Sequence, residues 1–518
     1  MRWVVTTFAT EKIPKKSLIK LSMKRTLLFP LFMLFLICHC IEINSQTLTP
    51  PPGKLPRING AKVFGVRPES PVLFKIAASG EKPMKYEVTG LPNGLALNNE
   101  TGIITGKLSK RGDYQMQVKV TNGLGKAERV LTIKVGDKIA LTPPMGWNSW
   151  NCWGRDVSKA KVLSSAQAMI DKGLIDHGWS YINVDDAWEG QRAADGTIQS
   201  NDSFPDMKGL GEWLHTRGLK FGIYTAPGPK TCLGFVGSYN HELQDMTTFA
   251  DWGVDYVKSD WCSYSGIFDQ EKDTSLAAYK KPYLRMYDAI KVQNRDIYYS
   301  VCQYGMREVW KWGESVGANS WRTTGDIEDT WESMHEIGFN QYFMYPYAKP
   351  GHWNDPDMLV VGNVGWGKNL HPTRLTPDEQ YTHISLWSLL AAPLLLGCDL
   401  AALDDFTLSL LTNDEVLDIN QDPLGKQARR VYCNRSRYKF HLYAKELEDG
   451  SVALGIFNLM NYSLSYNDIS LSQMGLKGGM IRDLWRQKDI GVFDDILKVN
   501  IPAHGVLLYR ITKVDNNK

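Results

Sequence analysis

The chain has 518 residues, too many for one ordinary domain and enough for about two to four domains that each bury a core. It carries 59 basic and 56 acidic side chains, and the net charge of +3 gives no electrostatic reason to expect binding to nucleic acid or to an anionic membrane. Most of its 17 tryptophans and 23 tyrosines are expected in cores, but such rings also line sugar-binding sites.

The N-terminus has the pattern of a secretory signal. A basic pair precedes an apolar run at residues 27–38, and small residues near Ser45 offer a cleavage site. Residues 1–22 fit no part of a signal peptide, so we expect Met23 to be the start and assign residues 1–46 to the signal region. The mature protein is therefore expected to be exported, either periplasmic or extracellular.

Neither a membrane span nor a metal site is expected in the rest of the chain. The other long apolar stretch, residues 384–398, is interrupted by Pro393 and is shorter than the roughly 20 residues of a membrane helix. Six of the eight cysteines follow the signal region, and export permits them to form disulfides. They form no Cys-x-x-Cys pair and no clustered histidines accompany them, so we expect no metal and no cofactor.

The first folded domain is predicted to be an immunoglobulin-like β-sandwich at residues 57–138, after a proline-rich linker at residues 47–56. Alternating apolar and polar residues, separated by turns, predict strands at residues 72–76, 86–88, 114–120 and 130–135. The segment at residues 90–106 resembles the immunoglobulin-like modules of exported bacterial enzymes. It shows no cluster of acids or histidines, which favours a spacer or packing role.

Strand and helix patterns alternate through residues 139–422, which is typical of parallel βαβ units. The strands are expected at residues 145–147, 181–184, 221–224, 254–257, 297–301, 320–322, 352–353 and 394–396. Amphipathic helices are expected at residues 160–171, 207–216, 284–292 and 379–390. Eight strands over about 260 residues match the size of a (β/α)8 TIM barrel.

Alternating strand patterns return at residues 423–518 and predict a C-terminal antiparallel β domain, with strands at residues 439–444, at 452–457 and within 497–511.

Charged side chains follow four of the eight barrel strands. They are Asp185 and Asp186, Lys258 and Asp260, Arg322 and Asp326, and Asp355 and Asp357. One such aspartate could be an ordinary helix N-cap, but capping does not explain four strands that end in carboxylates. Because the carboxyl ends of barrel strands form one rim, we expect these groups to converge there.

Converging carboxylates, without metal ligands or a phosphate-binding loop, indicate glycoside hydrolysis. That reaction needs one carboxylate that attacks the anomeric carbon or activates water, and a second that protonates the leaving oxygen. Asp260 is the predicted nucleophile because Lys258, two residues earlier on the same strand face, is expected to keep it ionised.

Asp326 is the predicted general acid. Glu328 and Asp329 follow it closely, and negative charges near it would raise the pKa of its carboxyl. Sequence spacing leaves Asp355 and Asp357 open as alternatives for either role.

Six motifs together resemble glycoside hydrolase family 27, the α-galactosidases or melibiases. They lie, in the family's order, at residues 143–150, 183–188, 258–262, 321–327, 353–358 and 419–425. The resemblance extends from Leu141 to the C-terminus and does not include the first 140 residues. It implies a retaining mechanism, with Asp260 as nucleophile and Asp326 as acid/base.

The resemblance also implies which residues bind the sugar. Asp185 and Asp186 match the residues that bind the 4- and 6-hydroxyls of galactose, Lys258 matches the residue at the 3- and 4-hydroxyls, and Arg322 matches the residue near the 2-hydroxyl. Trp150, Tyr224 and Met358 match the pocket wall, and Cys232 and Cys262 match a disulfide beside the site. The sequence Cys302-Gln303-Tyr304 departs from the usual Cys-Glu-Trp, and Gln303 stands where a glutamate contacts the sugar 2-position.

The sequence therefore predicts an exported retaining exo-α-galactosidase that acts on oligosaccharides or polysaccharides with terminal α-linked galactose. The alternative within the same fold is an exo-glycosidase for another sugar, such as β-L-arabinopyranoside, α-N-acetylgalactosamine or an isomaltose unit. The intact Asp185-Asp186 pair argues against relatives that reject the 6-hydroxymethyl group. A carbohydrate-binding protein without activity is a further alternative, which the presence of both Asp260 and Asp326 disfavours.

Overall fold

The computed structural model describes residues 47–434 and 440–513. The predicted signal region, with Met23 and the cleavage site near Ser45, lies outside these residues. Within the described part of the chain, every helix is too short or too polar to span a lipid bilayer.

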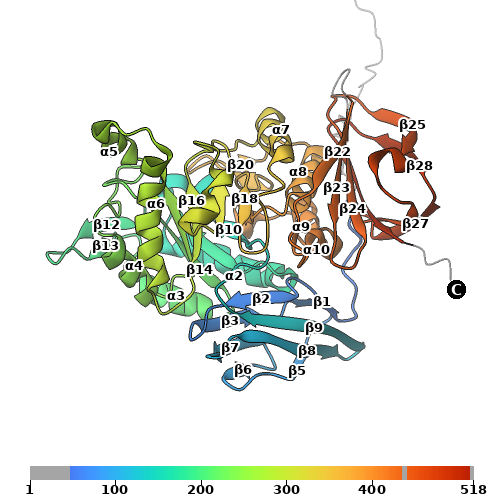
Figure 1. Cartoon of the computed structure of the whole chain (residues 1–518). Helices are drawn as coiled ribbons and strands as arrows, with labels where there is room; N and C mark the ends of the chain where they lie inside the picture. Colours follow the sequence, from blue (N-terminus) through green and yellow to red (C-terminus); the bar gives the residue numbers. More distant parts are fainter. Residues whose placement is uncertain (1–46, 435–439, 514–518) are drawn as a thin grey trace, which may run out of the picture. The chain divides into compact units, whose positions relative to one another are not determined.

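The N-terminal domain is a sandwich of two sheets, as predicted (Figure 1). One sheet contains, in spatial order, β2 (Val63–Val66), β9 (Gly125–Val135), β8 (Gly112–Asn122) and β5 (Lys85–Thr89). The other contains β3 (Pro71–Lys75), β7 (Ile103–Lys107) and β6 (Leu95–Leu97), and the short strands β1 (Arg57–Ile58) and β4 (Ala78–Ser79) pair separately. The side chain of Asn122 accepts hydrogen bonds from the backbone of Leu124 and Gly125, which closes the predicted turn between β8 and β9.

The central domain is the predicted TIM barrel, an eight-stranded sheet in which every pairing is parallel (Figure 1). Its strands are, in spatial order, β18 (Trp353–Asp355), β17 (Ser320–Arg322), β16 (Tyr298–Cys302), β15 (Tyr256–Asp260), β14 (Lys220–Thr225), β11 (Tyr181–Val184), β10 (Met145–Asn148) and β21 (Leu394–Leu396). A parallel bridge between Leu359 and Leu396 joins the two edges. The carboxyl ends of the strands therefore meet on one rim.

Helices follow most of the barrel strands. They are α1 (Trp150–Trp153), α2 (Lys159–Asp171), α3 (Met207–His215), α4 (Glu242–Asp251), α5 (Tyr264–Glu271), α6 (Leu276–Lys291), α7 (Trp331–Phe339), α8 (Pro377–Leu389), α9 (Asp405–Leu411) and α10 (Asp414–Asn420). Side-chain caps begin several of them, and Thr376 and Glu379 form a capping box at α8. The predicted helix at residues 284–292 is only the second half of α6, which accommodates Pro282 and begins at Leu276.

The C-terminal domain is antiparallel, as predicted (Figure 1). Its larger sheet contains β22 (Arg429–Cys433), β23 (Phe440–Glu446), β24 (Val452–Asn458), β29 (Val506–Thr512), β26 (Gly479–Asp483) and β27 (Lys488–Phe493), and β25 (Leu464–Ser470) pairs with β28 (Ile496–Ile501). The predicted run at residues 497–511 is divided between β28 and β29 by a turn in which Gly505 N donates to Pro502 O. Thr382 of α8 donates a 2.6 Å hydrogen bond to His504 O, which ties the barrel to this domain.

Arg67 of the sandwich makes a dense set of contacts with the barrel. Its Nε lies 2.6 Å from Asp296 Oδ1, and its terminal nitrogens donate to the carbonyls of Lys291, at the end of α6, and of Gln293 and Arg295 in the loop that follows. Its own backbone N–H donates to Asp296 Oδ2 at 2.9 Å. One side chain therefore satisfies three carbonyls and a carboxylate of the neighbouring domain.

The predicted linker at residues 47–56 is also held against the barrel. Leu48 N donates a 2.9 Å hydrogen bond to Tyr381 Oη, and Asn413 Nδ2 donates to Thr49 Oγ1 at 3.2 Å. Hydrogen bonds to α8 and to Asn413, the N-cap of α10, thus hold the start of this segment in place.

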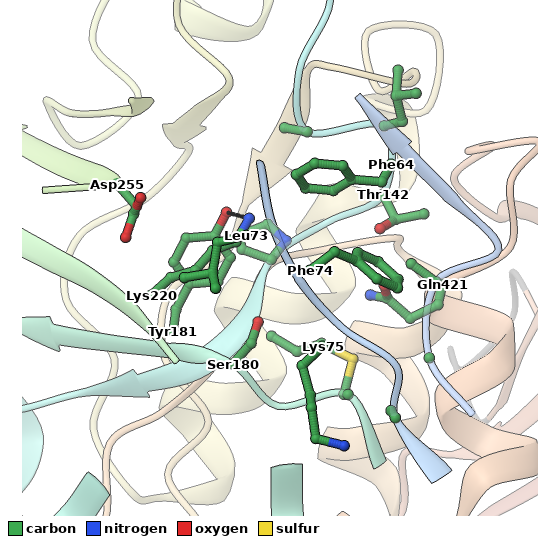
Figure 2. Close-up of a pocket in the computed structure, with 18 of the residues that line it drawn as sticks. Phe64, Leu73, Phe74, Lys75, Thr142, Ser180, Tyr181, Lys220, Asp255 and Gln421 are labelled. Carbon is green, nitrogen blue, oxygen red and sulfur yellow. Dashed lines mark hydrogen bonds between the residues drawn. The ribbon is translucent and has the colours of Figure 1, made fainter. Parts of the chain in front are cut away.

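A cavity of about 130 Å³ lies between the sandwich and the barrel, as Figure 2 shows. Phe64 and Phe74 line it from the sandwich, and Tyr181, Lys220 and Asp255 line it from the barrel. Lys220 Nζ lies 4.7 Å from the centre of the Phe64 ring and donates a 3.4 Å hydrogen bond to Tyr181 Oη. These barrel residues stand at the beginnings of strands, so the cavity belongs to the domain contact at the end opposite the charged rim.

Arg67→Ala is expected to lower the free energy of unfolding by about 1–3 kcal/mol, because it removes hydrogen bonds from a charged donor. Thermal unfolding of the full chain measures the change. Arg111→Ala is the matched control, since Arg111 pairs with Asp137 on an exposed surface and its loss should leave the melting temperature unchanged. Equal melting temperatures for both variants would contradict a stabilising domain contact.

Candidate active site

The predicted rim residues do converge, and most of them are buried. Asp185 and Asp186 follow β11, Lys258 and Asp260 belong to β15, and Arg322 ends β17. Only 1% to 9% of the surface of each is exposed. Because a buried charge is costly without a partner, the pairing of these groups determines what the site can do.

Lys258 is paired with Asp185. Its Nζ donates a 2.9 Å hydrogen bond to Asp185 Oδ2, and lies 5.0 Å from the centre of the Tyr224 ring on the strand between them. Asn148 Nδ2 donates to the same carboxylate oxygen at 2.8 Å. Burial would lower the pKa of Lys258, but Asp185 and the other charges outweigh burial and raise it well above its usual value.

Asp260 is held by two phenols instead of a cation. Tyr304 Oη donates to its Oδ1 at 2.7 Å, and Tyr224 Oη donates to its Oδ2 at 3.3 Å. Burial raises the pKa of Asp260 above its usual value, although Lys258 and the Tyr304 hydrogen bond oppose this shift. Lys258 therefore lowers the pKa of Asp260, as expected, but its ammonium bonds Asp185 and burial outweighs its effect.

Arg322 connects the exposed Asp326 to the buried Asp357. Its Nη2 lies 3.0 Å from Asp326 Oδ1, and its Nη1 lies 3.0 Å from Asp357 Oδ1. The side chain of Asp326 is 64% exposed and stands at the mouth of the site. Burial raises the pKa of Asp357, whereas for Asp326 the effect of burial is outweighed by Arg322, which lowers the pKa.

The predicted cause of a raised pKa at Asp326 is wrong. Asp329, which was expected to crowd Asp326 with negative charge, is bonded to Arg374 at 2.7 Å. Glu328 Oε2 lies 3.9 Å from Arg374 Nη2. A cation outside the motif thus neutralises these acids, and Arg322 remains the dominant charge beside Asp326.

Asp355 and Asp357, the alternatives that the sequence left open, lie next to Arg322. Asp355 is its neighbour in the strand pairing, and Asp357 forms an ion pair with it. Asp355 Oδ1 accepts a 2.8 Å hydrogen bond from the backbone N–H of Asp357, and Asp357 Oδ2 accepts one of 2.9 Å from Ile327. Burial raises the pKa of Asp355 to about 6. Both carboxyls are buried in the barrel. This position suits them to stabilise the charge of Arg322, whereas an acid that protonates a leaving group must be accessible.

The remaining predicted sugar contacts surround this cluster. Trp150 begins α1, and its backbone N–H donates to the Oδ1 of Asn148, the residue that holds Asp185. Met358 directly follows Asp357 and is buried. Gln303 follows β16, is 1% exposed, and its amide nitrogen and oxygen have no hydrogen-bond partner among the described residues. Its amide is therefore free to bind a ligand hydroxyl.

A disulfide joins Cys232 to Cys262, with Cα atoms 4.9 Å apart. Leu233 N, next to Cys232, donates a 2.9 Å hydrogen bond to Asp186 Oδ2. The two sulfurs and a carboxylate oxygen of Asp260 lie within 4.8 Å of one another, but oxidised cysteines lack the thiolate that a metal requires. The bridge thus fixes the loop that holds Asp186.

Family models match almost the whole described chain. Residues 142–422 match the model described as "Alpha galactosidase A", which extends over more than half of the chain. The chain belongs to the alpha-galactosidase family of glycoside hydrolases. Residues 438–511 match the family's C-terminal beta sandwich domain, and residues 55–136 match a model described as a "Putative Ig domain". The family resemblance inferred from the six motifs is confirmed.

Individual members of the family agree with this assignment. The alpha-galactosidase of Cyamopsis tetragonoloba is 40% identical over 72% of this chain and 87% of its own. A Bacteroides fragilis crystal structure described as a "putative alpha-galactosidase/melibiase" is 36% identical, with a TM-score of 0.83 over 90% of this chain and 99% of that one. The Saccharomyces cerevisiae alpha-galactosidase structure with raffinose is 28% identical, with a TM-score of 0.65 over 72% and 98% of the two chains.

Sequence reasoning did not assign roles to Asn148 and Tyr304. Asn148 lies within the first family motif but carries no charge, so nothing in the pattern marked it as a partner of Asp185. Tyr304 was visible only as a departure from the family's tryptophan, and its contact with Asp260 depends on the turn that follows β16.

The double variant Cys232→Ser with Cys262→Ser is expected to lower the free energy of unfolding by about 3 kcal/mol, because it frees the intervening loop in the unfolded chain. It should also raise KM for an aryl α-galactoside, since Leu233 no longer holds Asp186. Thermal unfolding and steady-state kinetics measure both effects. Cys433→Ser is the control, because Cys433 is free and half-buried; identical behaviour of the two variants would refute the role of the bridge.

Proposed function

We propose that this protein is an exported retaining exo-α-galactosidase that removes terminal α-linked galactose from oligosaccharides or polysaccharides. The observation that carries the proposal is the contrast between two carboxyls on one rim. Asp260 is buried and held by neutral donors, whereas Asp326 is exposed at the mouth. The first environment suits a nucleophile and the second suits an acid/base that exchanges protons with a leaving group and water.

The proposed reaction has two displacements. Asp260 attacks the anomeric carbon as the glycosidic bond breaks, and Asp326 gives its proton to the departing oxygen. A water molecule then attacks the same carbon, Asp326 takes its proton, and Asp260 leaves as a carboxylate. Asp355 and Asp357 have their contacts directed to one another, to the backbone of Ile327 and to Arg322, which supports the choice of Asp260 and Asp326.

Asp326 needs different protonation in the two steps. Its ion pair with Arg322 lowers its pKa, which suits the second step, where it acts as a base. In the first step, bound substrate covers this exposed carboxyl while Asp260 is still charged. Loss of water and a neighbouring negative charge both raise a carboxyl pKa and favour the acid form.

The charged groups of the rim supply the proposed sugar contacts. Asp185 and Asp186 accept hydrogen bonds from the 4- and 6-hydroxyls of galactose, and Lys258 donates to the 3- and 4-hydroxyls. Arg322 and Gln303 face the 2-position. The Lys258–Asp185 pair supports this assignment because it presents a donor and an acceptor side by side, the combination that neighbouring hydroxyls match.

The remaining proposed contacts form the pocket wall, with Trp150, Tyr224 and Met358 against the apolar surface of the sugar ring. Tyr224 and Met358 are buried and Trp150 is half-buried. Apolar walls of this kind orient a ligand whose hydroxyls meet a few polar groups.

Export rests on the signal pattern at residues 1–46 and is supported by the Cys232–Cys262 disulfide. Disulfides persist in oxidising compartments and are rare in the cytosol. A periplasmic or extracellular enzyme would meet terminal galactose on material outside the cell.

A panel of aryl glycosides tests the function. We expect kcat/KM for the α-galactoside to exceed that for the β-L-arabinopyranoside, the α-N-acetylgalactosaminide and an isomaltose-type substrate by at least about tenfold, since each loses or adds a group at a position that the rim recognises. Proton NMR of the first product formed should show α-galactose, as retention requires. A preference for another sugar, or release of the β-anomer, would overturn the proposal.

A further inference from the structure

We propose that Tyr304 positions the carboxylate of Asp260 for attack and for departure, a role that rests on the proposed function of Asp260 as the nucleophile. The phenol of Tyr304 makes the shorter of the two hydrogen bonds to Asp260, at 2.7 Å against 3.3 Å for Tyr224. The two phenols contact different oxygens of the carboxylate. Together they fix the plane of the group, which a single donor would leave free to rotate.

The backbone after β16 holds Tyr304 in place. Tyr304, Gly305, Arg307 and Glu308 all have φ between +55° and +85°, a left-handed conformation that side chains rarely adopt. A Cβ on Gly305 would lie 2.2 Å from Thr323 O, so this turn packs directly against the residue after β17. Arg307 Nη2 donates to Thr274 O at 2.8 Å and anchors the other side. Although 37% of Tyr304 is exposed, its ring is carried by a constrained turn.

The charge changes at Asp260 give this hydrogen bond its role. Asp260 is an anion before the first step, becomes a neutral ester when its oxygen bonds the anomeric carbon, and is an anion again when it leaves. A phenol donates a stronger hydrogen bond to a carboxylate than to an ester oxygen. Tyr304 therefore favours the ionised free enzyme and the departing carboxylate, and keeps its own proton throughout.

The groups around Asp260 determine how its pH dependence should change. The titratable or charged side chains that interact with it are Lys258, Tyr304, Asp185, Arg322, Tyr224, Cys302 and Tyr283. Burial raises the pKa of Asp260, while Lys258, Tyr304 and Arg322 lower it. Loss of the Tyr304 hydroxyl removes one of the groups that favour the anion. Since the nucleophile works ionised, the acidic limb of kcat/KM should move to higher pH.

Tyr304→Phe, measured with an aryl α-galactoside from acidic to neutral pH, tests the proposal. The plateau of kcat/KM should fall about ten- to a hundredfold, because the carboxylate of Asp260 is no longer held in the plane required for attack. The acidic limb should move to higher pH, because the variant loses a group that lowers the pKa of Asp260. Tyr345→Phe removes the hydroxyl of a surface tyrosine outside the rim and should keep the wild-type pH dependence of kcat/KM. Both variants should have the melting temperature of the wild type.

Two outcomes would count against the inference in different ways. If the acidic limb of Tyr304→Phe does not move, whether or not kcat/KM falls, Tyr304 has only a packing role. That result would overturn this proposal and leave the proposed function intact. Asp260→Gly, assayed with azide, tests the underlying function: azide should restore cleavage and form β-galactosyl azide. Failure of azide to restore cleavage would overturn Asp260 as nucleophile, and the role of Tyr304 with it.

Discussion

Burial of charge at one end of the barrel is the constraint on which the rest of the site depends. An ammonium or guanidinium removed from water must find carboxylates and further hydrogen bonds in its place. Lys258 forms an ion pair with Asp185, and Arg322 forms ion pairs with Asp357 and Asp326. These pairs fix donors and acceptors before a ligand arrives, so little reorganisation is needed when sugar hydroxyls bind.

The same constraint separates the two carboxyls that are proposed to carry the reaction. Among the described residues, Asp260 accepts hydrogen bonds only from the neutral phenols of Tyr304 and Tyr224, which leaves its charge available for the anomeric carbon. Asp326 shares Arg322 with Asp357 but remains exposed, where a leaving group and water can both reach it. Identical side chains thus gain different chemistry from different surroundings.

The architecture could be predicted from the sequence because it depends on local patterns. Tyr181–Val184, Ser320–Arg322 and Leu394–Leu396 are strands with the predicted bounds, and charges at strand ends predicted the rim. The pairing of those charges could not be predicted, because it depends on strand order and side-chain direction. Lys258 reaches from β15 past β14 to a residue after β11, not to its near neighbour on the same strand. The left-handed turn that carries Tyr304 has no comparable sequence signal.

The most direct test of this account is to identify the carboxyl that becomes covalently bonded to the sugar. A 5-fluoro-α-galactosyl fluoride forms a glycosyl-enzyme that hydrolyses slowly, and mass spectrometry of the digested protein locates the label. The account predicts one labelled peptide, with the sugar on Asp260. A label on Asp355 or Asp357, or turnover through no covalent species at all, would contradict it.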